Sequence, residues 1–389
     1  MSPVPSQVLD VATPGDELLR RVVGDFARNR IRPLAGELDA TERFPAELYR
    51  EMAELGLFGV TVPAELGGAG GTALDYLSVM EGLSYGYASV ADQCGLVELV
   101  GTLLAEDGTP PQRERYLAPL LRTERRCAYA LTEPGAGSDL GGVRTRARRR
   151  ASGGWTLTGE KIFIHNAPVA DFAAVLAVTD PERGKRGGVS VFLVDLDAPG
   201  VSRPYREHKM GQRASPVGGL VFDEVVLGDD ALLGEEGQGF RAMMRVLAKG
   251  RLGIAGLALG ISRAALDAAA EHAASRRQFG RPIGVNQAVA FPIADMVTEY
   301  RAALLLALDA ARLLDSTACS MAKLFATEAC VRHTATAVQI FGGSGYIQGY
   351  EVERLYRDAR ITTIYEGTSE MQRLIVSRAV LGRLDGGAG

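Results

Sequence analysis

A segment with the texture of β-strands separates two long segments with helical periodicity, and this order limits the fold more than any other feature of the chain. Between residues 127 and 232, short runs rich in Val, Ile, Phe and Thr alternate with Gly, Asp and Pro, a pattern typical of a compact barrel or sandwich. No helical pattern of crossover length lies between the runs, which argues against a parallel, Rossmann-type sheet.

The flanking segments show apolar residues at helical spacing, for example Leu18, Val22 and Phe26 within 14–58. A second helical stretch, 73–121, is interrupted by Gly108-Thr-Pro-Pro111, which predicts a helix stop and restart. Further helical patterns cover 240–275, 286–315, 318–341 and 366–382. We therefore predict an α+β fold with three parts: an N-terminal helical domain (1–126), a middle β-barrel or sandwich domain (127–232) and a C-terminal four-helix bundle (233–389).

Composition excludes several classes of partner. A net charge of −4 argues against nucleic acid, and charged residues interrupt every long apolar stretch, which argues against a membrane span. The first residues lack the basic and apolar regions of a secretory signal, so we expect a cytoplasmic protein. Scarce Lys beside abundant Arg, Ala and Gly indicates a GC-rich bacterial genome. The four Cys are widely spaced, which predicts buried, inert thiols and no metal site.

Two signatures carry chemistry. In Thr132-Glu-Pro-Gly-Ala-Gly-Ser-Asp139, the residues Gly135, Gly137 and Ser138 predict a turn whose N–H groups and hydroxyl face an anion or a polar ring edge. Far downstream, Glu366 is followed directly by Gly367. Glycine lets a backbone donor approach a ligand beside the carboxylate, as proton abstraction next to a carbonyl requires.

The two signatures, in this order between helical segments, resemble the flavin-dependent acyl-CoA dehydrogenases over residues 15–383. The resemblance implies FAD as cofactor and conversion of an acyl-CoA to its 2,3-enoyl thioester. Glu366 would abstract the α-proton while flavin N5 takes the β-hydride. Some branches of the family carry the catalytic glutamate on the helix near residue 250; this chain has Gly250 there, which leaves Glu366 as the base.

The family motifs transfer further roles to matching positions. Thr132 would bond the pyrimidine edge of the flavin, and Ser138 would lie near the pyrophosphate and the substrate's pantetheine. Two segments, around 276–279 and 339–346, would reach the FAD of a neighbouring subunit. The predicted cofactor residues are Tyr129, Leu131, Thr132, Gly137, Ser138, Phe163, His165, Arg276, Gln278, Phe279, Gln339, Gly342, Gly343, Thr368 and Glu370. The predicted substrate residues are Leu99, Ser138, Arg251, Tyr365 and Gly367, with residues 96–100 near the base of the acyl pocket.

Three positions depart from the family pattern. His165 stands where relatives have a Ser or Thr near flavin N5, so its imidazole either makes a structural hydrogen bond or tunes N5 and the substrate. Ala248 replaces a frequent acidic residue, and the link 315–319 between two helices is short. The run Gln339-Ile-Phe-Gly-Gly-Ser-Gly-Tyr346 predicts a helix C-cap followed by a turn. It is not a dinucleotide motif, because position 348 is Gln and no strand precedes the glycines.

Three rival functions fit the same scaffold. In the first, the acyl group is carried by an acyl or peptidyl carrier protein, as in biosynthetic relatives. The chain would otherwise be a non-catalytic scaffold, which the presence of Glu366 disfavours, or an oxygen-using flavoenzyme. By resemblance, the electron acceptor is an electron-transferring flavoprotein and the assembly is a homotetramer built as a dimer of dimers.

Overall fold

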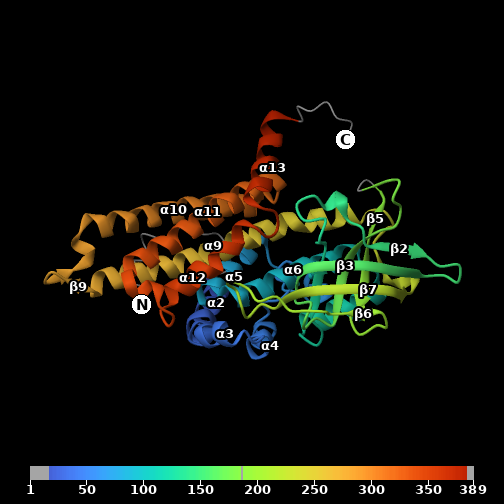
Figure 1. Cartoon of the computed structure of the whole chain (residues 1–389), viewed down its shortest axis with the longest axis horizontal. Helices are drawn as coiled ribbons and strands as arrows, with labels where there is room; N and C mark the ends of the chain where they lie inside the picture. Colours follow the sequence, from blue (N-terminus) through green and yellow to red (C-terminus); the bar gives the residue numbers. More distant parts are fainter. Residues whose placement is uncertain (1–16, 185–186, 383–389) are drawn as a thin grey trace.

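The computed structural model describes residues 17–184 and 187–382. The molecule is elongated, with the sheet at one end, long C-terminal helices extending to the other, and the N-terminal helices beside them (Figure 1). This is the three-part α+β arrangement predicted from the sequence.

Helices build the N-terminal part. Helix α6 ends at Asp107, and Thr109 caps the next helix through a reciprocal pair of hydrogen bonds with Gln112. The predicted stop and restart is therefore confirmed. The helices are α2 (Glu17–Phe26), α3 (Ala35–Thr41), α4 (Ala46–Glu54), α5 (Ala73–Gly86), α6 (Ala88–Asp107), α7 (Pro110–Gln112) and α8 (Ala118–Leu121), with 3-10 and π turns at 27–34, 64–66 and 113–117.

The middle part is an eight-stranded sheet in the order β6-β7-β3-β2-β4-β5-β8, with β1 paired to β4. Its pairs are antiparallel except that β4 runs parallel to β1 and β2. Trp155 and Phe192 meet edge to face in its core. The strands are β1 (Cys127–Ala130), β2 (Arg146–Arg149), β3 (Trp155–His165), β4 (Phe172–Val178), β5 (Val189–Asp195), β6 (Val201–Ser202), β7 (Val217–Leu227) and β8 (Leu232–Leu233).

The C-terminal part is organised around the long helix α9. Glycines on α9 let α5 approach: a Cβ at Gly256 would lie 2.9 Å from the Leu77 carbonyl oxygen, and one at Gly260 2.0 Å from Ser84 Oγ. The elements are α9 (Gly239–Ser275), β9 (Arg277–Gln278), β10 (Arg281–Pro282), α10 (Gln287–Leu313), α11 (Ser316–Phe341), α12 (Glu351–Arg360) and α13 (Ser369–Leu381).

The elements differ from the sequence prediction in three places. Helix α12 was not predicted, although its strong amphipathic pattern places Val352, Leu355 and Ala359 in the core. Helix α13 starts at Ser369, later than the predicted 366. Helices α6 and α9 are long and apolar enough to span a membrane, contrary to expectation, but 89% and 94% of their most apolar windows are buried within the protein. These two are core helices of the fold.

Two smaller predictions are confirmed. Gly342, with a φ of 60°, is the C-cap residue of α11. All four cysteines are free and buried. Burial also raises the pKa of the Cys127 and Cys94 thiols, which keeps them protonated and inert.

Candidate active site

Glu366 lies in the turn between residues 361–363 and α13, with its backbone in the left-handed region at a φ of 53°. Gly367 follows at a φ of 92°. The carboxylate Oε2 atom is sealed from solvent and has no hydrogen-bond partner among the described residues. A buried polar atom without a partner is costly. This atom is therefore free to accept a proton or a hydrogen bond from a bound ligand.

The Glu366 carboxylate occupies the space where a side chain at position 250 would stand. A Cβ built on Gly250 would lie 1.9 Å from Oε2 of Glu366 and 2.8 Å from its carboxyl carbon. Helix α9 can therefore hold the carboxylate against its surface only because residue 250 is glycine.

The surroundings of Glu366 raise its pKa to about 7, and burial is the main cause. The negative charge of Asp92 adds to this rise, whereas the cations Lys323 and Arg251 oppose it. A carboxyl group with a pKa near neutrality can take up and release a proton at working pH, which is the requirement for a general base.

Lys323 fixes the turn that carries Glu366. Its buried ammonium donates hydrogen bonds to the carbonyl oxygens of Thr362, at 3.0 Å, and Gly367, at 2.8 Å. Gln372 from α13 donates to the Gly367 oxygen as well, at 2.7 Å. Two helices, α11 and α13, thus hold the backbone on both sides of Glu366.

Three of the predicted substrate residues lie close to Glu366. Gly367 and Tyr365 flank it in the chain, and the charge of Arg251 acts on its carboxyl group. The Arg251 guanidinium is largely buried and donates to Ser316 Oγ at 2.8 Å. Leu99 is buried on α6, which packs against α9.

Several predicted flavin residues gather where β1 leaves the sheet. The Tyr129 hydroxyl donates to the Met243 carbonyl oxygen at 3.2 Å, which ties β1 to the start of α9. The backbone carbonyl oxygen of Thr132 accepts a hydrogen bond from the Ile162 N–H at 3.0 Å, so the signature loop lies along β3. Beside it β3 is irregular, and Phe163 has a φ of 56° and is 63% exposed. Leu131, which lies between Tyr129 and Thr132 in the sequence, is buried.

The signature turn is shaped by a buried ion pair that the sequence did not single out. Lys161 donates to Glu133 at 2.8 Å, and the same carboxylate accepts the N–H groups of Arg144 and Thr145. Ser138 and Gly137 remain exposed, and a Cβ on Gly137 would meet no atom within 4 Å. The turn is therefore preformed and open to a ligand.

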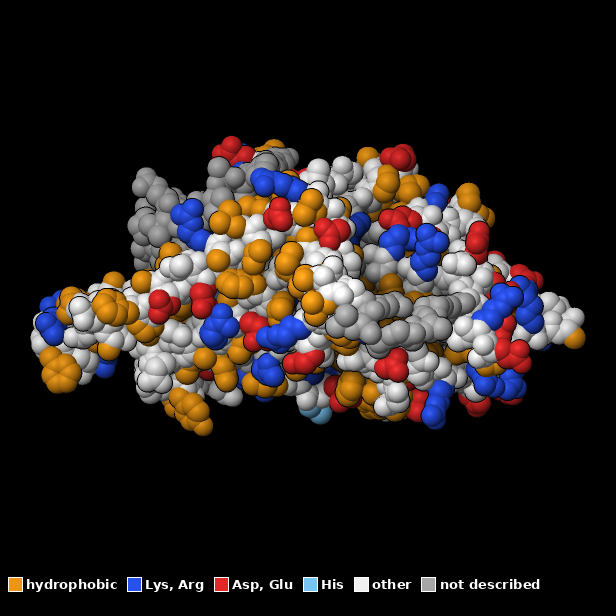
Figure 2. Space-filling model, turned by 90° about the horizontal axis from the view of Figure 1, so that it is seen from above, with side chains coloured by type: hydrophobic (Ala, Val, Ile, Leu, Met, Phe, Trp, Pro, Cys, Tyr) orange, Lys and Arg blue, Asp and Glu red, His pale blue; other side chains and the backbone are white. Residues whose placement is uncertain are grey.

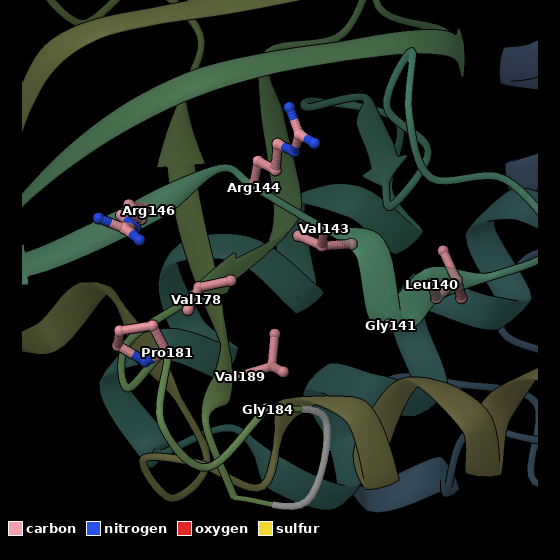
Figure 3. A pocket seen from close by; sticks show the side chains of 9 residues that line it. All are labelled: Leu140, Gly141, Val143, Arg144, Arg146, Val178, Pro181, Gly184 and Val189. Carbon is pink, nitrogen blue, oxygen red and sulfur yellow. The ribbon is translucent and has the colours of Figure 1, made fainter.

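A hollow of about 500 Å³ lies beside this turn, on the edge of the sheet domain (Figure 3). Apolar side chains form most of its wall, and Arg144 points away from them. Its lining residues are Leu140, Gly141, Val143, Arg144, Arg146, Val178, Pro181, Gly184 and Val189. None of them belongs to the group around Glu366, so the hollow is separate from that group.

His165 lies in a hydrogen-bond network with residues that the sequence analysis missed. Its Nε2 atom is 2.7 Å from Ser215 Oγ and 2.9 Å from Gln93 Nε2, and the Ser215 hydroxyl donates to Asp92 at 2.7 Å. Burial lowers the pKa of His165, so its imidazole is neutral near pH 7. The ring is thus engaged within the protein, and its predicted contact with FAD stays a prediction.

The remaining predicted cofactor residues lie elsewhere in the chain. Arg276, Gln278 and Phe279 form the tip of the β9–β10 arm at the opposite end of the molecule from the sheet (Figure 1). The end of α11 lies near this tip, because Phe341 stacks on His272 of α9. Gln339, Gly342 and Gly343 are therefore part of the distant group and are exposed. Thr368 caps α13, and Glu370 is exposed in its first turn.

The open positions fit a flavin nucleotide. Glycines 135, 137, 342 and 343 leave room, since a Cβ at any of them would meet nothing within 4 Å. Phe163 and Phe279 expose rings on which a flat heterocycle can lie. Arg276 supplies a guanidinium suited to phosphate oxygens. Polar backbone, aromatic surface and a cation are thus all present. They lie in two groups, one at the signature turn and β3 and the other at the β9–β10 arm and the end of α11.

Comparisons with known proteins agree with this picture. Models of the N-terminal, middle and C-terminal domains of acyl-CoA dehydrogenases match residues 13–124, 128–225 and 237–381. The short-chain specific acyl-CoA dehydrogenase of Clostridium acetobutylicum is 40% identical over 93% of this chain and 96% of its own length.

Two further relatives bear on partners and fold. The caffeyl-CoA reductase-Etf complex subunit CarC of Acetobacterium woodii is 41% identical over 94% of this chain and 98% of its own. The solved structure of butyryl-CoA dehydrogenase from Megasphaera elsdenii superimposes with a TM-score of 0.90 at 37% identity, and covers 94% of this chain and 97% of that one.

Proposed function

Because the chain belongs to the acyl-CoA dehydrogenase family, we propose that Glu366 is the base with which it removes the α-proton of an acyl thioester. The enzyme is an FAD-dependent oxidoreductase that acts on the CH–CH bond of acyl-CoA substrates. The observation that carries the assignment of the base is the unpartnered, sealed Oε2 atom of Glu366 against Gly250.

The turn around Glu366 supplies what proton abstraction needs. The thioester α-proton is weakly acidic, so the charge that develops on the thioester oxygen requires hydrogen-bond donors. No acceptor among the described residues takes up the Glu366 N–H, which leaves that donor for the substrate. Bound FAD supplies the hydride acceptor. Lys323 and Gln372 hold the turn rigid, so base and donor keep their relative positions.

Replacement of Glu366 by Gln tests the assignment. The amide keeps the shape of the side chain but cannot accept the proton, so FAD stays bound while turnover falls by roughly 10²-fold or more. Bleaching of the flavin absorbance under anaerobic conditions by butyryl-CoA, and by its carrier-protein thioester, measures this step. An active Glu366→Gln enzyme would remove Glu366 from this role. Bleaching of the unmodified enzyme only by the carrier thioester would assign a biosynthetic substrate.

A second copy of the chain completes the cofactor site. Helix α9 rises about 1.5 Å per residue, so about 39 Å separate Gly250 from Arg276 along its axis. One FAD molecule cannot bridge the two groups of residues within a single chain at that separation. The arm of one copy would therefore serve the site of another. Apolar side chains spread over the helical part of the face that carries α10, α11 and α13 support such an assembly (Figure 2).

The proposed assembly is a homotetramer, a dimer of dimers. Exposed apolar side chains on α10 and α11, which include Phe291, Leu305 and Met321, supply contact area. An electron-transferring flavoprotein is the proposed acceptor, because a relative of nearly the same length is a subunit of a complex with Etf.

Free, buried thiols suit a reducing compartment, and we place the enzyme in the cytoplasm. Light scattering and reduction of an added electron-transferring flavoprotein test the first two points.

A further inference from the structure

The hydroxyl of Tyr76 is another buried polar atom near Glu366 that lacks a partner among the described residues. Tyr76 belongs to α5 and its side chain is fully buried, yet no described residue accepts or donates a hydrogen bond to its oxygen. An orphaned hydroxyl in the interior lowers stability, so its presence needs a reason.

Glycines on two helices make room for the Tyr76 hydroxyl. A Cβ at Gly253 of α9 would lie 2.2 Å from the oxygen, and one at Gly95 of α6 3.7 Å from it. Gly253 follows Gly250 by three residues, nearly one turn of α9. The free oxygen of Glu366 and the free hydroxyl of Tyr76 therefore face neighbouring glycines on one side of the same helix.

The surroundings of Tyr76 set the kind of ligand it can meet. Burial is the main cause that raises the pKa of the phenol well above its usual value, and the nearby carboxyl groups of Glu98, Glu366 and Asp92 add to the rise. The phenol therefore stays neutral. A further carboxylate at this place would be repelled, whereas a neutral oxygen would be accepted.

A charged pair lies on the same two helices as the glycines that face Tyr76: Glu98 is on α6, three residues after Gly95, and Lys249 is on α9, four residues before Gly253. Glu98 is fully buried and accepts the Thr61 N–H at 3.1 Å, and Lys249 donates to Thr102 at 2.9 Å. Lys249 and Glu98 lie 3.7 Å apart. An alkyl chain that reached this pair would meet charged and polar groups, which is unfavourable for an apolar chain.

We propose that Tyr76 ends the acyl-binding region and donates a hydrogen bond to a neutral oxygen at the far end of a short acyl chain. The preferred substrates are thus short acyl thioesters with a terminal hydroxyl or carbonyl group, rather than plain alkyl or carboxylate-ended ones. This inference rests on the proposed function, since it presumes that the acyl α-carbon lies at Glu366.

A matched pair of substrates tests the proposal. The acyl groups of 4-hydroxybutyryl-CoA and pentanoyl-CoA have equal numbers of non-hydrogen atoms and differ in one terminal group. We expect the holoenzyme to have the higher kcat/KM for the hydroxyl compound. In Tyr76→Phe, which lacks only the phenol oxygen, this preference should fall about tenfold or more. Glutaryl-CoA, with its terminal carboxylate, should be the poorest of the three.

Two variants keep the test independent of damage to the fold. Tyr49→Phe removes another buried, unpartnered hydroxyl, packed between Phe44 and Phe58 away from Glu366, and should leave the preference unchanged. Both Phe variants should melt a few degrees above the unmodified enzyme without substrate, about 2–4 °C. Tyr76→Ala should raise the activity ratio of octanoyl-CoA to butyryl-CoA.

The outcomes separate this inference from the proposed function. An unmodified enzyme that favours pentanoyl-CoA, an unchanged ratio in Tyr76→Phe, or a melting temperature lowered by that change would each overturn the role of Tyr76. In those cases dehydrogenation itself still stands. Failure of every acyl-CoA to bleach the flavin would instead overturn the function from which the inference starts.

Discussion

Gly250 permits Glu366 to lie against α9, and this gives the first prediction at the scale of single residues. In Gly250→Ala the new methyl group would overlap the carboxylate, so Glu366 must move away from the thioester α-carbon. We expect kcat to fall about 10²-fold with FAD retained. Gly36→Ala is the matched control, since a Cβ there meets nothing within 4 Å. Equal turnover in the two variants would contradict the placement.

The raised pKa of Glu366 predicts the pH dependence of turnover. Its carboxyl group must be ionised to accept the α-proton, and its pKa is about 7. We therefore expect kcat/KM to rise with pH through about 7 and then to level off. The folded-state pKa exceeds the unfolded one, so this group lowers stability as pH rises from about 4.3 to 7. A rising limb of the activity profile centred near pH 4.5 would show that burial does not raise the pKa of Glu366.

Lys323 offers a third prediction, because it both holds the turn and opposes the rise of the pKa of Glu366. Lys323→Met removes two hydrogen bonds and one positive charge. The rising limb of the pH profile should move to higher pH, and the enzyme should melt at a lower temperature. If the melting temperature falls but the rising limb of the pH profile stays at the same pH, Lys323 has a purely structural role.

At the scale of elements, the long periodic helices and the β-rich runs followed from local pattern. Helices α9, α10 and α11 lie within three residues of their predicted ends. The start of α13 could not be predicted in this way, because Glu366 and Gly367 adopt positive φ values that helical periodicity does not reveal. The irregularity of β3 at Phe163 was not predicted for the same reason, since Phe163 also has a positive φ.

Contacts between elements account for what sequence reasoning missed in the site. Tyr76, Asp92 and Ser215 come from three different elements, α5, α6 and the loop before β7, and no local spacing joins them. One usable signal was the scarcity of Lys, which occurs at only five positions. Of these, Lys161 and Lys323 are fully buried and bind carbonyl oxygens or a carboxylate. Two of the few lysines therefore mark interior contacts of this fold.

At the scale of the whole molecule, the separation of the two groups that we propose to bind the flavin predicts that mixed oligomers recover activity. Glu366→Gln lacks the base, and Arg276→Glu lacks a cation on the arm, so each variant alone should be inactive. When the two are co-expressed, some sites combine Glu366 from one chain with Arg276 from the other. We expect roughly a quarter of normal activity per chain if the chains pair at random. Chains that each built a complete site alone would recover nothing.

The length of α9 also connects enzyme abundance with catalytic capacity. Glu366 faces Gly250, and the arm begins at the far end of the same helix, after Ser275. In the assembly that we propose, a lone chain would therefore hold two incomplete half-sites. At concentrations below the dissociation constant of the dimer, the number of complete sites then grows with the square of the chain concentration. A modest change in gene dosage would therefore produce a larger change in metabolic flux, and dilution of a cell extract would shed flavin before any chain unfolds.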